Sequence, residues 1–206
     1  MACLSRIAAL AISMAAWLGL AVQFDASLAQ IGSVGETLWV MLRYFTIIIN
    51  LLAAIAFTGI ALGKAAWVTP ARLGGLTLSI LLVGIVYALL LDGLLTLSGG
   101  AKLADVLLHR ATPVAVPLYW LAYASKGALT WRGPAKWTLL PLGYFLYAMV
   151  RGAVEGEYAY PFLDVAKLGW GSTLGTVLVM ALAFLAAGYA LVWLDRRLAK
   201  HGRHLA

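Results

Sequence analysis

Cysteine and charge are both scarce in this chain. Cys3 is the only cysteine among 206 residues, so no disulfide can form within the chain and no cysteine-based metal cluster is available. Only 11% of the residues are charged, whereas about a quarter are charged in a typical soluble domain. The sequence also has no Walker loop, no dinucleotide-binding fingerprint and no G-x-S-x-G elbow. We therefore expect a protein that is not an ordinary soluble domain and that holds neither a cofactor nor a metal.

Apolar side chains, in contrast, make up 64% of the residues, and the mean hydropathy is +0.94. A helix needs about 20 mostly apolar residues to cross ~30 Å of hydrocarbon. Six stretches meet this requirement and predict an all-α integral membrane protein, a bundle of six transmembrane helices in a single domain, residues 1–206. The predicted helices are residues 5–24, 36–62, 74–97, 105–124, 136–153 and 172–194. The first also resembles a signal peptide, but its apolar run is long for a cleaved signal, which favours a retained helix.

Basic residues gather in alternate loops. They lie at the N-terminus, after the second and fourth predicted helices and in the C-terminal tail, while the other loops hold most of the acidic residues. Because Lys and Arg accumulate on the cytoplasmic side of a membrane, this pattern places both termini in the cytoplasm. It also explains the formal net charge of +7 without a nucleic-acid partner. The tail residues are interpreted as a topology signal and a contact for anionic lipid; they are Arg196, Arg197, Lys200 and Arg203.

A polar stripe interrupts the second predicted helix. Arg43, Thr46 and Asn50 are spaced by three, four and seven residues, which brings them to one face of an α-helix. Such a stripe must face protein or water rather than lipid, because polar groups are costly in hydrocarbon.

Three further polar residues are expected at a similar depth. At 1.5 Å per residue, the predicted topology places Asp92, His109 and Arg110 in the outer half of the bilayer, together with Arg43 and Thr46. This distribution predicts one polar pocket that opens toward the outer leaflet. The same estimate places Thr46 and His109 ~9 Å apart in depth, which counts against direct contact between the two side chains.

His109 lies beside a helix-breaking residue. Pro113 lacks the amide that would bond the His109 carbonyl, and a bent helix next to a histidine is typical of a cavity wall. The alternative is a proline kink that serves packing alone. A histidine in this setting can act as a general base, and Thr46 carries a removable proton, although helical threonines usually bond their own i−4 carbonyl.

Several separated motifs together resemble a known family. They are Tyr44-Phe45-Thr46 with Asn50-Leu51-Leu52, Leu107-Leu108-His109 with Pro113 and Trp120, Pro141 and Tyr144 before Arg151-Gly152, and Tyr160-Pro161-Phe162-Leu163-Asp164. This combination is similar to the androgen-induced membrane-protein family and its bacterial relatives. The chain departs from the bacterial pattern at Ile48 and Ile49, where a polar pair is usual, and at Tyr119, where an acid is usual.

The resemblance implies a hydrolase of fatty acid esters of hydroxy fatty acids, with Thr46 as nucleophile and His109 as base. Arg43 and Asn50 are then candidate donors to the oxyanion. Asp92 either orients His109 or forms a structural salt bridge with Arg43 or Arg110. Pro113, Trp120 and Tyr160 are the candidate substrate pocket.

The resemblance also implies a lipid or fatty acyl ester substrate and a bacterial inner membrane. A non-catalytic lipid-binding or scaffold protein is the main alternative function. A small transporter ranks last, because the polar groups lie in one half of the predicted spans only. The sequence predicts no oligomeric state.

Overall fold

The computed structural model describes the chain from residue 2 to residue 203, except residue 95, and it shows no strand in that part. Helices make up 83% of the protein. Among the described residues, three helices are long and apolar enough to cross a membrane, or four if one bent pair counts as a single span. The predicted all-α class with several apolar helices of membrane-spanning length is therefore confirmed.

The chain divides into two compact units, which meet in sequence between Ser125 and Lys126. The predicted single domain over residues 1–206 stays a prediction.

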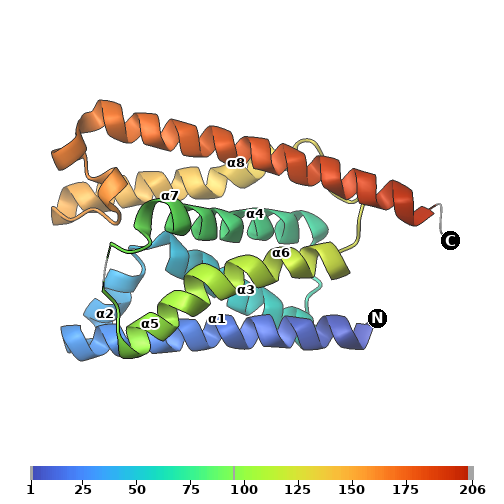
Figure 1. Cartoon of the computed structure of the whole chain (residues 1–206), viewed down its shortest axis with the longest axis horizontal. Helices are drawn as coiled ribbons and strands as arrows, with labels where there is room; N and C mark the ends of the chain where they lie inside the picture. The colour runs from blue at the N-terminus through green and yellow to red at the C-terminus, as the bar shows by residue number, and fades with distance from the viewer. Residues whose placement is uncertain (1, 95, 204–206) are drawn as a thin grey trace. The chain divides into compact units, whose positions relative to one another are not determined.

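The first unit holds most of the helices (Figure 1). Its elements are α1 (Ala2–Ile31), α2 (Val34–Met41), α3 (Phe45–Ala61), α4 (Pro70–Val86) with the π-helical turn η1 (Tyr87–Leu91), α5 (Gly99–Val106), the π-helical turn η2 (Leu107–Ala111) and α6 (Thr112–Tyr123). Thr69 caps α4 by accepting a hydrogen bond from the Arg72 amide, and Pro70 occupies the first turn, where its missing N–H costs nothing.

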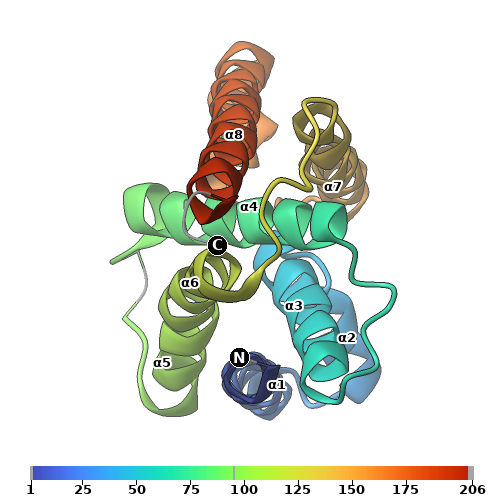
Figure 2. The ribbon, with the colours of Figure 1, turned by 90° about the vertical axis from the view of Figure 1, so that its right-hand side faces the viewer.

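Helices α1 and α4 lie on opposite sides of α3 and α6 (Figure 2). Small residues let the elements approach closely. A Cβ on Gly19 of α1 would lie 2.7 Å from a Leu108 methyl carbon, and a Cβ on Gly84 of α4 would lie 2.7 Å from the Pro113 Cβ. The core between α1, α3 and η2 is aliphatic, and its fully or nearly fully buried members are Ala16, Leu20, Met41, Ile47, Ala54 and Leu108.

The predicted continuous helix over residues 36–62 is wrong. The axis turns by 96° between α2 and α3. The last turn of α2 tightens, since the Arg43 and Tyr44 amides bond the Val40 and Met41 carbonyls, and Tyr44 then adopts an extended conformation. The depth of Thr46 estimated along one straight helix, and the ~9 Å mismatch with His109, therefore no longer hold.

The other predicted helices overlap observed ones. Four of them match in position: 5–24 overlaps α1, 105–124 overlaps α5, η2 and α6, 136–153 overlaps α7, and 172–194 overlaps α8. The stretch 74–97 begins in α4 and continues past the end of η1 at Leu91. Asp92 therefore lies just outside the helix, with an extended backbone conformation.

The second unit consists of α7 (Gly133–Glu155), the short 3-10 helix η3 (Pro161–Leu163) and α8 (Val165–Arg203). Gly156 ends α7 in the left-handed conformation, at φ 72°, which favours glycine. Helix α8 is kinked at Gly169, which has φ 73° and ψ 160°. Ala148, Met149 and Leu163 form the buried cluster between these elements, with aromatic side chains packed around it.

Candidate active site

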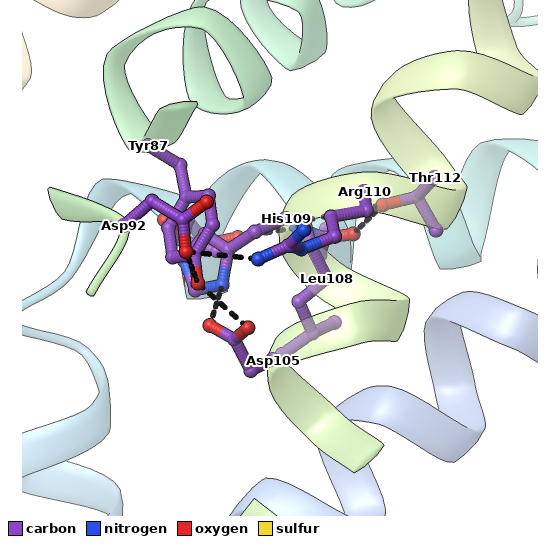
Figure 3. A network of polar contacts seen from close by, with 9 residues as sticks. Tyr87, Asp92, Asp105, Leu108, His109, Arg110 and Thr112 are labelled. Atoms are coloured by element: carbon purple, nitrogen blue, oxygen red, sulfur yellow. Dashed lines mark hydrogen bonds and ion pairs between the residues drawn. The ribbon is translucent and has the colours of Figure 1, made fainter. Parts of the chain in front are cut away.

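Two π-helical turns bring the polar residues of the first unit together. In η1 the Asp92 amide bonds the Tyr87 carbonyl, and in η2 the Thr112 amide bonds the Leu107 carbonyl, each five residues back. Pro113 directly follows η2 and has no amide to offer. Single π-helical turns occur frequently at functional sites, because the wider turn re-aims its side chains. Here they direct Tyr87 and His109 toward one another (Figure 3).

The centre of the site is the Asp105 carboxylate. Its Oδ2 accepts a hydrogen bond from the Tyr87 hydroxyl at 2.7 Å, and its Oδ1 lies 3.0 Å from His109 Nδ1. The imidazole stacks on the Tyr87 ring, with centroids 4.3 Å apart and an 18° interplanar angle. The His109–Asp105 contact has the distance of an ion pair but not the angles of a good hydrogen bond. Such contacts often tighten only when substrate binds.

The rim of the site is an exposed ion pair. Arg110 donates to Asp92 Oδ1 at 2.8 Å, and the Tyr87 hydroxyl lies 3.2 Å from the same oxygen. Side-chain exposure is 53% for Arg110 and 45% for Asp92, against 21% for His109 and 11% for Asp105. The cluster of Tyr87, Asp92, Asp105, His109 and Arg110 thus runs from an accessible rim to a nearly buried carboxylate. Of the two predicted roles for Asp92, the structure shows the salt bridge to Arg110.

Asn50 fastens α3 to η2. Its side-chain amide donates to the Thr46 carbonyl at 2.9 Å and to the Leu108 carbonyl at 3.1 Å, and its Oδ1 accepts from the Thr112 hydroxyl at 2.6 Å. The Leu108 carbonyl accepts from side chains, from Asn50 and at 3.3 Å from the Thr112 hydroxyl, because the π-helical turn diverts the Thr112 amide to Leu107. Both amide protons of Asn50 are thereby engaged. Its predicted role as an oxyanion donor stays a prediction.

Thr46 lies in the first turn of α3, and it is buried. Its carbonyl and that of Leu108 bind the same Asn50 nitrogen, so the Thr46 backbone is held beside the residue that precedes His109. The Thr46 hydroxyl forms no hydrogen bond with any residue that the structure describes. The helical threonines Thr58, Thr77 and Thr138, in contrast, bond their own i−4 carbonyls. Thr46 differs because the carbonyl four residues before it belongs to Leu42, which lies outside α3.

Arg43 is buried at the corner between α2 and α3. Because the helix breaks between them, Arg43 and Thr46 no longer share one helical face as the sequence predicted, whereas Thr46 and Asn50 still do.

The three predicted pocket residues have different surroundings. Pro113 packs against Gly84, and Trp120 is a core residue with 2% exposure. Tyr160 belongs to the second unit, where it stacks on Phe162 with centroids 5.0 Å apart. A shared substrate pocket of these residues stays a prediction.

Tyr87 and Asp105 were missed as site residues. Asp105 had a usable signal, because it lies four residues before His109 and such pairs meet on a helix. Tyr87 had none, since its position in a long apolar run is equally typical of packing. Among the residues that the structure describes, no group of three or more His, Cys, Asp or Glu is arranged to hold a metal ion.

Replacement of Asn50 provides a test of the fastening role. Asn50→Leu is expected to destabilise the protein by about 1–3 kcal/mol, because the Thr46 and Leu108 carbonyls lose their amide donor and the buried Thr112 hydroxyl keeps only its longer bond, 3.3 Å to the Leu108 carbonyl. The measurement is thermal unfolding of the purified protein in detergent. Addition of Thr112→Val, which removes the hydroxyl that has lost its shorter acceptor, is expected to recover part of the loss. Equal stability of the wild type and Asn50→Leu would contradict the role.

Comparisons with protein-family models, curated proteins and solved structures find no match to this chain. The geometry defines a helical protein with apolar helices and a partly buried His–Asp–Tyr cluster. Its relation to the androgen-induced membrane-protein family stays a prediction from the sequence motifs.

Proposed function

We propose that the chain is an intramembrane hydrolase of lipid esters, acting on fatty acid esters of hydroxy fatty acids or similar acyl esters. Thr46 is the nucleophile and His109 the base. The single observation that carries the proposal is the contact of His109 Nδ1 with a nearly buried carboxylate, Asp105. A histidine held through Nδ1 presents Nε2 to a reacting group, as in serine-hydrolase triads. Nε2 of His109 forms no hydrogen bond within the described part of the chain.

The reaction follows the pattern of acyl transfer. The Thr46 oxygen attacks the ester carbonyl while His109 Nε2 takes the hydroxyl proton, and His109 returns that proton to the departing alcohol. Water then adds to the threonyl ester with His109 again as base, which releases the fatty acid and restores Thr46. The Thr46 hydroxyl is suited to this role because no helix carbonyl or side chain in the described residues holds it.

Two features support stabilisation of the oxyanion. The positive end of the α3 dipole lies at the turn that carries Thr46, and this end favours a developing negative charge. Arg43, a buried cation at the same corner, is the candidate donor. Asp105 takes the orienting role that the sequence had suggested for Asp92.

The membrane placement belongs to the same proposal. Six spans in a bacterial inner membrane, with both termini cytoplasmic, account for the alternation of basic and acidic loops. In that topology the Asp92–Arg110 rim faces the outer leaflet, from which lipid esters and water enter.

A non-catalytic lipid-binding or scaffold protein is the second candidate. The hydrogen bonds of Asn50 favour it, because they show one polar residue serving entirely to join two helices. In that case the cluster around Asp105 has a structural role as well.

The two candidates are separated by an activity assay on the wild-type protein. The purified chain, in nanodiscs, is incubated with a branched fatty acid ester of a hydroxy fatty acid, and the released acid is quantified by mass spectrometry. We expect release that rises with protein concentration. Folded protein that binds the ester without releasing acid would favour the binder.

A further inference from the structure

The second unit contains a cleft that the proposed function does not use. It has a volume of about 590 Å³ and lies between the C-terminal end of α8 and the segment that precedes α7. Its side-chain lining combines two tryptophans and three cations and includes no carboxylate; these residues are Trp131, Trp193, Arg196, Arg197 and Lys200.

One wall of the cleft is a single face of α8. Trp193, Arg196, Arg197 and Lys200 are spaced at three, four and seven residues, so they line up along the helix. Arg197 lies over the Trp193 ring, with its Cζ 5.2 Å from the ring centroid. This face lies at the end of a candidate membrane span, Val165–Lys200.

The opposite wall is the segment before α7, which a buried carboxylate fixes to α8. Asp195 Oδ2 accepts a hydrogen bond from the Leu129 amide at 3.0 Å, and Asp195 is fully buried. Gly127, at φ +83°, comes so near to α8 that a Cβ there would lie 2.9 Å from the Ala199 Cβ. Only glycine suits both the conformation and the approach. Asp195 thus holds the segment before α7 against α8 and does not line the cleft.

Trp131, on this segment, makes a cation–π contact with Arg196 across the cleft. The Arg196 guanidinium lies over the Trp131 ring, with its Cζ 5.2 Å from the centroid. A cation–π contact of this kind uses the charge of the guanidinium and does not occupy its N–H donors with an acceptor atom. Neither Arg196 nor Lys200 forms a hydrogen bond or ion pair with the residues that the structure describes. Their donors are available to an anion.

We propose that this cleft binds the phosphate headgroup of an anionic phospholipid. Arg196 contributes in-plane donors that suit phosphate oxygens, and Lys200 contributes a point charge one turn further along. A lipid of the bilayer is favoured because the cleft lies where an apolar helix ends. Its tryptophans, 46% and 52% exposed, are the side chains enriched at headgroup depth.

The test is a lipid titration of the full chain followed by native mass spectrometry. Wild-type protein in detergent receives phosphatidylglycerol or phosphatidylcholine, and the apparent affinity for each is measured. We expect tighter binding of phosphatidylglycerol. The double variant Arg196→Gln/Lys200→Gln is expected to bind it about 25-fold more weakly, from about fivefold for each cation near a membrane surface. Binding of phosphatidylcholine should remain as in the wild type.

The matched control is Arg132→Gln/Lys136→Gln. It removes two exposed cations from the same unit, outside the cleft, and should retain the preference for phosphatidylglycerol. An equal loss in both double variants, or an unchanged preference in Arg196→Gln/Lys200→Gln, would overturn the proposal. Complete displacement of the lipid by inorganic phosphate at the same concentration as the lipid would overturn the headgroup assignment, because the lipid would then bind no better than free phosphate. The single variants Arg196→Gln and Lys200→Gln provide the same comparison if the double variant does not fold.

Discussion

Thr46→Ala is expected to reduce ester hydrolysis by about 10³-fold or more, to the level of protein-free nanodiscs, because the acyl group then has no oxygen to receive it. Substrate binding should change little, since only a small side chain is removed. The effect should therefore fall on kcat rather than on KM. The measurement is a full kinetic comparison of variant and wild type on one ester.

Two variants make this result interpretable. Thr46→Ser keeps a hydroxyl in place and should retain measurable turnover. Thr77→Ala removes a threonine that is also buried in the first unit but that bonds only its own helix, and it should keep wild-type kinetics. Near-normal hydrolysis by Thr46→Ala would exclude Thr46 as the nucleophile.

His109→Ala is expected to cause the second large loss. Without the imidazole, no base takes the Thr46 proton, and the loss in kcat should reach at least about 10³-fold. Asp105→Asn should lower kcat by about 10²–10⁴-fold, since the corresponding change in a serine-protease triad costs about 10⁴-fold by favouring the wrong tautomer. Tyr87→Phe should have a smaller effect, because His109 keeps its contact with Asp105.

Folding must be compared in the same variants, since the cluster also joins η1 to η2. Size-exclusion profiles and unfolding temperatures provide that comparison. Asp105→Glu keeps a carboxylate but changes the packing. Higher turnover in Asp105→Glu than in Asp105→Asn would show that the carboxylate acts by orienting His109 and not only by packing. Full activity in a folded His109→Ala variant would contradict the assignment of the base.

The sequence predicted the helices well where hydrophobicity alone decides them. The stretches 5–24 and 172–194 lie inside longer observed helices that are apolar enough to cross a membrane, where a helix satisfies its own backbone hydrogen bonds. It failed at Leu42–Tyr44, where neither proline nor glycine marks the break. That corner separates Arg43 from the α3 face that carries Thr46, so a local change in backbone altered the predicted site.

The site was predictable only in part for a related reason. Pro113 correctly indicated a disturbed helix beside His109, but the disturbance is a π-helical turn, and nothing in the sequence identified the matching turn at Tyr87. The pairing of Asp105 with His109 follows from four-residue spacing, whereas the pairing of Asp92 with Arg110 depends on how η1 and η2 meet. Contacts along one helix can be inferred from spacing, and contacts between helices require the fold.

The most direct test of the central claim is to locate the nucleophile chemically. Purified wild-type protein is treated with a lipid-like fluorophosphonate, digested and mapped by tandem mass spectrometry. We expect one phosphonate adduct, on Thr46, that disappears in His109→Ala although that variant remains folded. Protein that hydrolyses esters yet carries the adduct on another residue would contradict it.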